Sequence, residues 1–212
     1  MRPTSDSDAP ILSRLDTERH AAPAETWISV DVETSGPVPG VASLLSIGAC
    51  VVWHPDQTFS VELRPVPGTT WSADAEAIHR LTHDHLATHG LEPADALARF
   101  ADWIAGLPSV AGGGRPVFVG FNAPFDWMFV ADYFWRYHGS NPFGVSALDI
   151  KTLYLGRSWP DVTAWSDTTR ARIDAHAPGI AGPPLTHDAL DDARRQAQLL
   201  ERLLADRDPS DR

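Results

Sequence analysis

Three strand-like segments, joined by short loops, follow one another at the start of the regular pattern. The first, TWISVDVE, alternates Ile28, Val30 and Val32 with residues of the opposite face, and its β-branched content favours a strand. SGPVPG ends it, a buried strand over residues 44–53 follows, and HPDQ is predicted to turn the chain into a third strand over residues 58–65. Consecutive strands with short loops favour antiparallel pairing at one edge of a sheet.

Beyond these strands, helical and strand-like segments alternate. Short helical turns are expected over residues 73–90, and a firmer helix over residues 93–107 has proline in its first turn and apolar residues at helical spacing. Strands first, then alternating helices and strands, indicate an α/β protein with a mixed sheet. The other expected elements are a strand at 117–119, an aromatic-rich helix at 123–138, a strand at 145–148, a helical turn at 149–155, a loop at 178–186 and a final helix at 188–205.

Length and composition indicate one soluble domain. We divide the 212 residues into a flexible extension (1–24), a folded domain (25–207) and a C-terminal tail (208–212). The lone cysteine, Cys50, excludes a disulfide framework and a metal site made of cysteines alone. Because no stretch approaches about 18 consecutive apolar residues and the first residues have no apolar signal core, we expect a cytoplasmic protein that does not bind a membrane.

Asp31 and Glu33 form an Asp-x-Glu pair at the end of the first strand. Residues i and i+2 of a strand point to the same face, so the two carboxylates project together, about 6–7 Å apart. Carboxylates at the end of a buried strand are costly unless they are paired or bind a cation. A solvated strand end is the simpler interpretation of such a pair by itself, but the apolar neighbours and the Gly/Pro loop make it less suitable here.

Asn122 and Asp126 lie where a short hydrophobic strand passes into a helix. In α/β proteins, functional sites gather at the carboxyl ends of strands. A local role is the alternative, because Asn122 is a suitable cap and Asp126 complements the helix dipole in the first turn. Aromatic residues crowd the same segment, and we expect all except Phe125 to belong to the core. These residues are Phe121, Phe125, Trp127, Phe129, Tyr133, Phe134 and Trp135.

His187 and three acidic residues mark the start of the final helix. Asp188 is a suitable N-cap, and Asp191 then lies at the third position, where a carboxylate is favourable for the helix dipole. A histidine beside carboxylates is also a candidate general base next to a metal ligand. The residues by themselves leave Asp191 and Asp192 as alternatives for that ligand.

The three acidic motifs, taken in order, are similar to those of one enzyme family. DVETSGP, FNAPFD and HDALDDA resemble the motifs of the DEDD superfamily of 3′–5′ exonucleases, in the histidine-containing group of the DNA-polymerase proofreading subunit, RNase T and oligoribonuclease. The family's His-to-Asp spacing selects Asp192 over Asp191. AIHRLTHDHL also resembles a family segment reading His-Gly-Ile/Leu-Thr, with Arg80 in place of glycine, and Ser46 stands where relatives often have glutamate.

The resemblance spans residues 26–204 and carries an expected fold. The family has a ribonuclease H-like α/β fold, a mixed five-stranded sheet in which three antiparallel strands are followed by parallel strands and helices flank the sheet. This agrees with the order of elements expected from the residues themselves.

The resemblance also implies a metal-dependent 3′–5′ exonuclease that releases nucleoside 5′-monophosphates by a two-metal mechanism. Asp31, Glu33 and Asp192 would bind one divalent cation, Mg²⁺ or Mn²⁺. Asp31 would also reach a second cation, which Asp126 would assist through water. His187 would take the proton from the attacking water. Four converging carboxylates repel one another, and two divalent cations would cancel their charge.

The implied substrate is the 3′ end of single-stranded DNA or RNA, contacted by Thr34, Asn122 and Phe125. A net charge of −11 argues against tight, salt-driven binding along a duplex, and the scattered arginines favour holding a substrate at its end. The stretch 156–184 is long and contains two tryptophans, and the sequence leaves open whether it covers the site.

Several alternatives stay open. The substrate is either DNA, in proofreading or repair, or RNA, as for an exoribonuclease or an oligoribonuclease-like enzyme. A non-catalytic module that binds nucleic acid or a partner would keep the fold, but it is expected to lose one of the acids, and all are present. A metal-dependent phosphatase of unrelated fold leaves the third motif unexplained. Short relatives often form homodimers, and no dimer interface can be read from this sequence.

Overall fold

The computed structural model describes residues 25–205; the extension predicted for residues 1–24 and the tail predicted for residues 208–212 lie outside this range. Five strands form one mixed sheet in the order β3-β2-β1-β4-β5. The strands are β1 (Glu25–Thr34), β2 (Leu44–Val51), β3 (His54–Glu62), β4 (Arg115–Gly120) and β5 (Ala147–Asp149). β1, β2 and β3 pair antiparallel, and β4 and β5 continue the sheet in parallel with β1, which confirms the predicted fold class.

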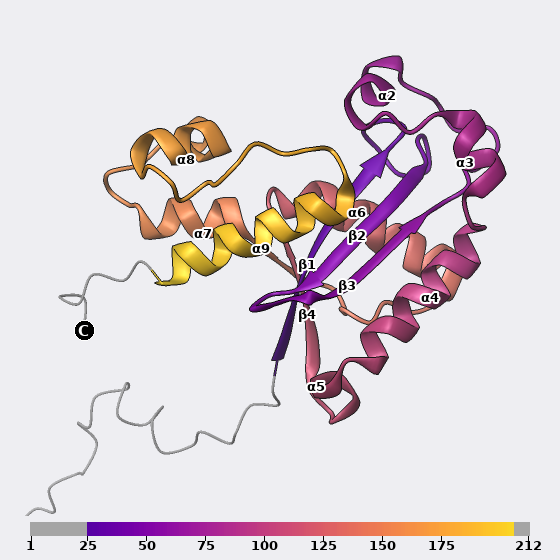
Figure 1. Ribbon diagram of the computed structural model, residues 1–212, viewed down its shortest axis with the longest axis horizontal. Coiled ribbons are helices and arrows are strands. Elements are labelled where there is room, and N and C mark those ends of the chain that lie inside the picture. The colour runs from indigo at the N-terminus through magenta and orange to yellow at the C-terminus, as the bar shows by residue number, and fades with distance from the viewer. Residues whose placement is uncertain (1–24, 206–212) are drawn as a thin grey trace, which may run out of the picture.

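Helices cover both faces of this sheet. They are α2 (Ala73–His79), α3 (His83–His89), α4 (Pro93–Gly106), α5 (Pro108–Ala111), α6 (Ala123–Tyr133), α7 (Ile150–Arg157), α8 (Arg170–His176) and α9 (Ala189–Ala205). Strand residues alternate between two cores: Val30 packs with Phe100 and Phe129 of α4 and α6, whereas Cys50 packs in the core that contains Leu200 of α9. Figure 1 shows α9 across one face of the sheet with α7 and α8 beside it.

Gly48 allows the start of α9 to lie directly against β2. A β-carbon at this position would come within 2.1 Å of both the Ala189 carbonyl carbon and the Leu190 nitrogen, so the approach requires glycine. Gly48 is the neighbour of Asp31 in the β1–β2 pair. The contact therefore brings the N-terminal end of α9 beside the carboxyl end of β1.

The connection between β2 and β3 differs from the prediction. HPDQ belongs to β3, and the turn is formed by Val52 and Trp53, with Trp53 in the left-handed region at φ 66°. β3 is an edge strand, and an edge tolerates Pro55 because one row of its N–H groups has no partner strand. β2 and β3 also end earlier than predicted, at Val51 and Glu62.

The aromatic helix predicted over residues 123–138 is divided in two. The α-helix ends at Tyr133, and the chain continues as a π-helical turn, Phe134–His138. Phe129 and Tyr133 are buried as expected, but Trp135 is 57% exposed on the π-helical turn. The expectation that Trp135 belongs to the core is therefore wrong, because the change of helical period moves it out of the buried face.

The stretch 156–184 contains regular structure. Besides the end of α7, it forms a 3₁₀ turn (Trp165–Thr168) and α8, and the predicted loop over residues 178–186 has no helix or strand. The final helix starts at Ala189, one residue after its predicted start. Among the described residues, no helix has the length and apolar character needed to span a bilayer.

Candidate active site

Asp31 and Glu33 lie near the end of β1, where this strand pairs with only one neighbouring strand. β4 pairs with β1 only as far as Ser29, so beyond this residue β1 has β2 on one side and, within residues 25–205, no strand on the other. The Ser29 hydroxyl donates to the Ala193 carbonyl of α9 at 2.8 Å. Because alternate residues share a face, Asp31 and Glu33 also face α9.

Asp126 occupies the edge that β4 leaves open. It is 4% exposed in the first turn of α6, and its Oδ1 accepts the N–H of Val32 at 3.1 Å. Val32 lies between Asp31 and Glu33, so this hydrogen bond docks the second acidic motif onto the first. The burial of Asp126 excludes a purely solvated role.

Asp192 and Asp191 have different surroundings. Asp192 is 1% exposed, and its two oxygens accept the backbone N–H groups of Thr186 at 2.8 Å and His187 at 2.9 Å. Asp191 pairs with Arg195 at 2.8 Å and accepts the Thr186 hydroxyl at 2.6 Å. Of the two alternatives left by the sequence, Asp192 is the one that lies beside the acids of β1, because one of its ligand atoms lies within 4.8 Å of one from Glu33.

Asp188 caps α9 as predicted, because its Oδ1 accepts the N–H of Asp191 at 2.9 Å.

The backbone is conformationally strained at several points of this region. His187, directly before Asp188, has φ 61°, and Arg80 and Asn122 also lie in the left-handed region. Residues other than glycine are uncommon there, and such strain gathers at functional sites.

Glu33, His187 and Asp192 form a group that could hold a metal ion. One ligand atom from each residue lies within 4.8 Å of the other two. Carboxylate oxygens and an imidazole nitrogen are donors that suit divalent ions such as Mn²⁺. Asp31 and Asp126 lie outside this group of three, but their charges act on it.

The carboxyl groups of the site are difficult to ionise together. Burial raises the pKa of Glu33 to about 8, and the charges of Asp192 and Asp126 add to the effect. Burial also raises the pKa of Asp126 to about 8, although the N–H of Val32 opposes the shift. The pKa of Asp31 lies well above its usual range because of burial and the charges of the other three carboxylates.

These four carboxylates lack a basic partner among the residues that the structure describes. None of the ion pairs found within residues 25–205 involves them. Buried negative charge is costly unless a cation compensates it, and hard oxygen donors suit Mg²⁺ and Mn²⁺. The residues present therefore fit the divalent cations that the sequence resemblance implies.

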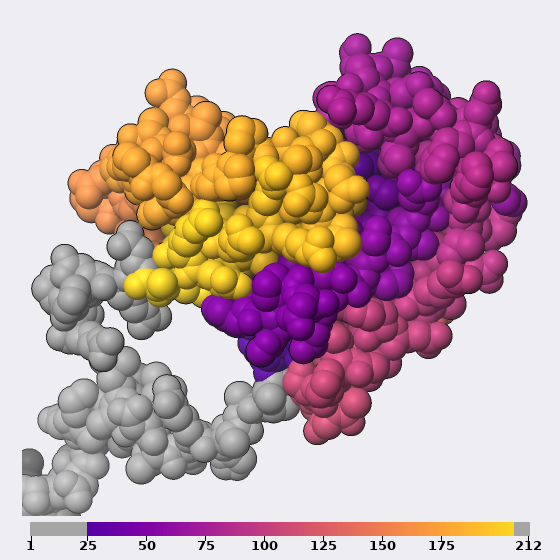
Figure 2. All heavy atoms as spheres, viewed as in Figure 1, coloured from indigo at the N-terminus to yellow at the C-terminus, as the bar shows by residue number. Residues whose placement is uncertain are grey.

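A cavity of about 240 Å³ opens beside Glu33 and His187. Figure 2 shows the surface hollowed between the start of α9 and the segment that contains α2. Ser46, His79 and Arg80 also line this cavity. Both positions at which the sequence departs from the family motifs, Ser46 and Arg80, therefore border the candidate site.

Asn122 precedes α6, but its side chain does not cap the helix, so this part of the local interpretation is wrong. The Ala123 N–H donates to Oδ1 of Asp149 instead, at 2.9 Å. The left-handed backbone of Asn122 directs its side chain elsewhere, and its Oδ1 accepts a hydrogen bond from Lys151 Nζ at 3.4 Å.

Thr34 and Phe125, the other two expected substrate contacts, are both engaged within the protein. Thr34 is buried, and its hydroxyl donates to the Gly36 carbonyl at 2.8 Å. Phe125 is partly buried against Phe129, with the two ring centres 5.6 Å apart. Their roles toward a substrate stay predictions.

Gln196 is a residue of the site that the sequence interpretation missed. It is 2% exposed and lies four residues after Asp192, on the same face of α9. Its Oε1 accepts the Phe121 N–H at 2.9 Å, and its Nε2 donates to Oδ1 of Asp31. An amide among the apolar residues that follow Asp192 on the buried face of the final helix is the signal that could have found it.

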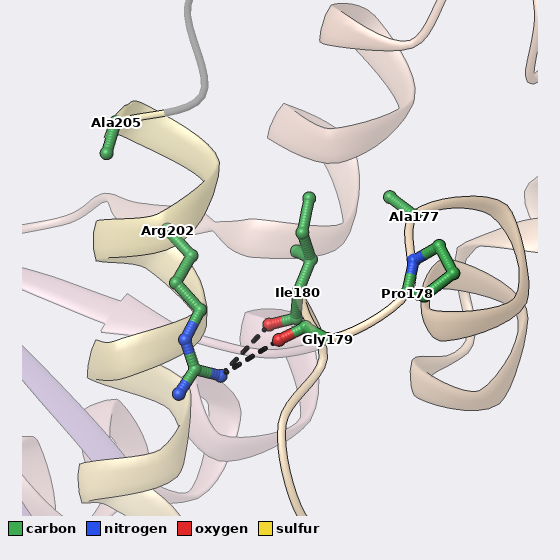
Figure 3. Close-up of a pocket in the computed structure, with 6 residues that line it drawn as sticks. All are labelled: Ala177, Pro178, Gly179, Ile180, Arg202 and Ala205. Carbon is green, nitrogen blue, oxygen red and sulfur yellow. Dashed lines mark hydrogen bonds between the residues drawn. The ribbon is translucent and has the colours of Figure 1, made fainter.

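The loop that leads to His187 is also held against the far end of α9. Nη1 of Arg202 donates to the carbonyl oxygens of Gly179 at 3.4 Å and Ile180 at 3.3 Å (Figure 3). These residues border a hollow of about 640 Å³. The chain between α8 and His187 is therefore attached to α9 at both ends.

Comparison with known proteins identifies the family. No protein-family model matches the chain. The chain is 46% identical over 176 residues to the 3′–5′ DNA exonuclease Cap18 of Escherichia coli, and the alignment covers 82% of this chain and 89% of Cap18.

Solved structures share the fold. The nuclease domain of 3′hExo, a DEDDh family member bound to rAMP, gives a TM-score of 0.67 at 16% identity and covers 85% of this chain and 92% of that chain. Escherichia coli exonuclease I in complex with an oligonucleotide gives a TM-score of 0.61 at 17% identity, over 88% of this chain and 42% of that chain. With this fold and its extensive identity to a named exonuclease, the chain belongs to the DEDD superfamily of 3′–5′ exonucleases.

Proposed function

We propose that this exonuclease removes nucleotides one at a time from the 3′ end of single-stranded DNA and releases nucleoside 5′-monophosphates. One observation carries the proposal: four acids from three distant segments converge beside an exposed histidine, with no basic partner in the described part of the chain. The acids are Asp31, Glu33, Asp126 and Asp192. Such an arrangement suits cation-assisted chemistry on a phosphate group.

Two divalent cations, Mg²⁺ or Mn²⁺, are the proposed cofactors. Asp31, Glu33 and Asp192 would hold one, and Asp31 and Asp126 would hold the other, with Asp126 acting through water. The mutual approach of Glu33 and Asp192 supports the first set, and the Asp126–Val32 hydrogen bond beside Asp31 supports the second. When bound, such a pair stabilises charge on the attacking and leaving oxygens of an in-line displacement.

His187 is the proposed general base. An imidazole accepts a proton near neutral pH, and this exposed side chain lines the same cavity as Glu33. The hydrogen bond from the His187 N–H to Asp192 fixes the backbone that carries it. His187 would therefore take the proton from a water molecule that attacks the terminal phosphodiester.

DNA is the proposed substrate rather than RNA. Support comes from Cap18, which is named a DNA exonuclease and is 46% identical to this chain. An RNA substrate would be recognised through its 2′-hydroxyl groups. The choice between the two is made by the experiment below.

The direct test is a degradation ladder on single-stranded DNA and RNA of the same sequence, each labelled at the 5′ end, with Mg²⁺, Mn²⁺ or EDTA. We expect products that shorten stepwise from the unlabelled end, faster on DNA, with no products in EDTA. Faster shortening of RNA would replace DNA by RNA as the substrate. Absence of products from both would contradict the proposed activity.

A further inference from the structure

The chain from α7 to α8 contains two cation–aromatic pairs, and the second of them contacts the junction of β4 and α6. Nζ of Lys151 lies 4.5 Å from the centre of the Trp165 ring, and the guanidinium carbon of Arg170 lies 5.6 Å from the centre of the Phe121 ring. Phe121 directly follows β4, so the second pair joins this segment to the carboxyl end of the sheet. In Figure 1, α7 and α8 lie on the side away from α2 and α3.

Arg170 shows that this segment comes close to the acidic site. Its Nη2 donates to the Ala181 carbonyl at 2.5 Å. Burial lowers the pKa of the guanidinium, and the negative charges of Asp192 and Asp31 oppose that shift. The Phe121 ring that Arg170 faces belongs to the residue whose N–H donates to Gln196, and Gln196 in turn donates to Asp31, so the segment forms a wall of the site.

Lys151 and Trp165 present a positive charge and an aromatic surface on this wall. Nζ of Lys151 lies 3.4 Å from Oδ1 of Asn122, the residue before the helix whose first turn carries Asp126. No carboxylate in the described part of the chain forms an ion pair with Lys151, and Trp165 is 50% exposed. In a chain of net charge −11, this is also the only lysine.

We propose that Lys151 and Trp165 form a binding surface for the substrate strand on the 5′ side of the bond that is cut. The ammonium group contacts a backbone phosphate, and the exposed indole stacks on a base. Asn122 positions Lys151 beside α6. This inference rests on the proposed exonuclease function and adds to it the place where the rest of the strand lies.

The chemistry of a single strand matches this surface. The 3′ end stops at the acids, so every further nucleotide extends away from them and must be held by another part of the protein. Proteins bind single strands without sequence preference by combining cations for the phosphates with aromatic side chains for the bases. The Lys151–Trp165 contact keeps both groups oriented while no strand is present.

The test measures binding of a fluorescein-labelled oligothymidylate of about 20 nucleotides by fluorescence anisotropy, in a background carrying Asp192→Asn so that the strand is not cut. We expect Trp165→Ala and Lys151→Gln each to raise the Kd about tenfold, the loss typical of one stacked base or one phosphate contact. Trp165→Phe keeps an aromatic face and is expected to restore most of the affinity. Trp135→Ala removes a tryptophan of similar exposure beyond the far end of α6 and is expected to leave the Kd unchanged.

The outcomes separate this inference from the proposed function. Unchanged Kd values for Trp165→Ala and Lys151→Gln, with melting temperatures equal to that of the parent, would overturn the inference even if the unmodified enzyme degrades DNA. If the enzyme degrades no nucleic acid but the two substitutions weaken binding, Lys151 and Trp165 still form a surface that binds a single strand, whereas the exonuclease proposal and the assignment to the 5′ side of a cut bond both fail. Equal losses with Trp135→Ala would also overturn it, because the effect would then not belong to this surface.

Discussion

Asp191 and Asp192 are adjacent in the sequence, and their carboxylates face opposite environments. Asp191 is stabilised by the Thr186 hydroxyl and Arg195, which lower its pKa. Asp192 is enclosed, receives two backbone N–H groups, and raises the pKa of Glu33 through its charge. A helix turns by about 100° per residue, so one step along α9 separates a surface ion pair from a candidate metal ligand.

Gln196 is expected to act through Asp31. Replacing it with alanine removes the donor to Oδ1 of Asp31 and leaves the Phe121 N–H without its partner. Loss of such an outer hydrogen bond typically lowers metal affinity or activity by about 10–100-fold. Calorimetric titration of the metal-free protein with Mn²⁺ measures the affinity, and wild-type affinity in Gln196→Ala would contradict the role.

Cys50 is expected to be unreactive in the folded protein. The thiolate is the reactive form, and burial between β2 and α9 raises the pKa of this thiol to about 12. Titration with a thiol-reactive chromogenic disulfide should therefore show no reaction near neutral pH until denaturant is added. Rapid reaction without denaturant would show that the contact between β2 and α9 opens readily.

At the scale of elements, the position of α9 depends on the close approach at Gly48. In Gly48→Ala the added β-carbon would overlap the backbone at Ala189 and Leu190, so α9 must move away from β2. We expect a loss of about 3 kcal/mol in the free energy of unfolding, the upper end for overpacking, together with a large loss of activity.

Urea unfolding measures the loss of stability in Gly48→Ala. Gly106→Ala is the matched control, because a β-carbon there meets no atom within 4 Å. A Gly48→Ala protein as stable and as active as Gly106→Ala would show that the approach of α9 to β2 is not needed.

The strands and helices were largely predictable from the sequence because local patterns determine them. Alternating apolar residues identified β1, and proline and apolar spacing identified α4. The failures lie where context overrides local preference. Pro55 favours a turn locally, but it lies in β3, which is an edge strand of the sheet. The aromatic residues of α6 give no signal for the position at which the helix changes to a π-helical turn.

The candidate site was predictable only in part, for a similar reason. The acids could be found because their spacing forms motifs along the chain. Gln196 and the Asp126–Val32 hydrogen bond could not, because they depend on which atoms three separate segments bring together. The contacts of Arg170 and Lys151 were equally hidden, since nothing in the sequence pairs them with particular aromatic rings.

For the whole molecule, the acidic site makes stability depend on pH when no metal is bound. Burial raises the pKa values of Glu33 and Asp126 to about 8 in the folded protein, from ordinary values of 4.5 and 3.8. Groups whose pKa is raised by folding stabilise the fold while protonated, and this contribution is lost as the pH rises through the folded value. The metal-free protein should therefore lose stability between about pH 5 and pH 8, and Mg²⁺ or Mn²⁺ should restore it.

Urea unfolding in EDTA at several pH values measures this dependence, and Asp126→Asn isolates the contribution of one group. Its amide oxygen still accepts the Val32 N–H but cannot ionise, so the stability of this variant should fall less steeply with pH. An identical pH dependence in the wild type and in Asp126→Asn would contradict the assignment of the raised pKa to Asp126.

The central claim is that acids from three distant segments act as one hydrolytic site, and Asp192 with its neighbour Asp191 tests it most directly. The measurement is the single-turnover rate of 3′-end removal from 5′-labelled single-stranded DNA by Asp192→Asn and Asp191→Asn in saturating Mg²⁺. We expect Asp192→Asn to lose at least about a hundredfold in rate, as for removal of a group that stabilises developing charge, and Asp191→Asn to stay near the wild-type rate. Equal rates for the two variants would contradict the account.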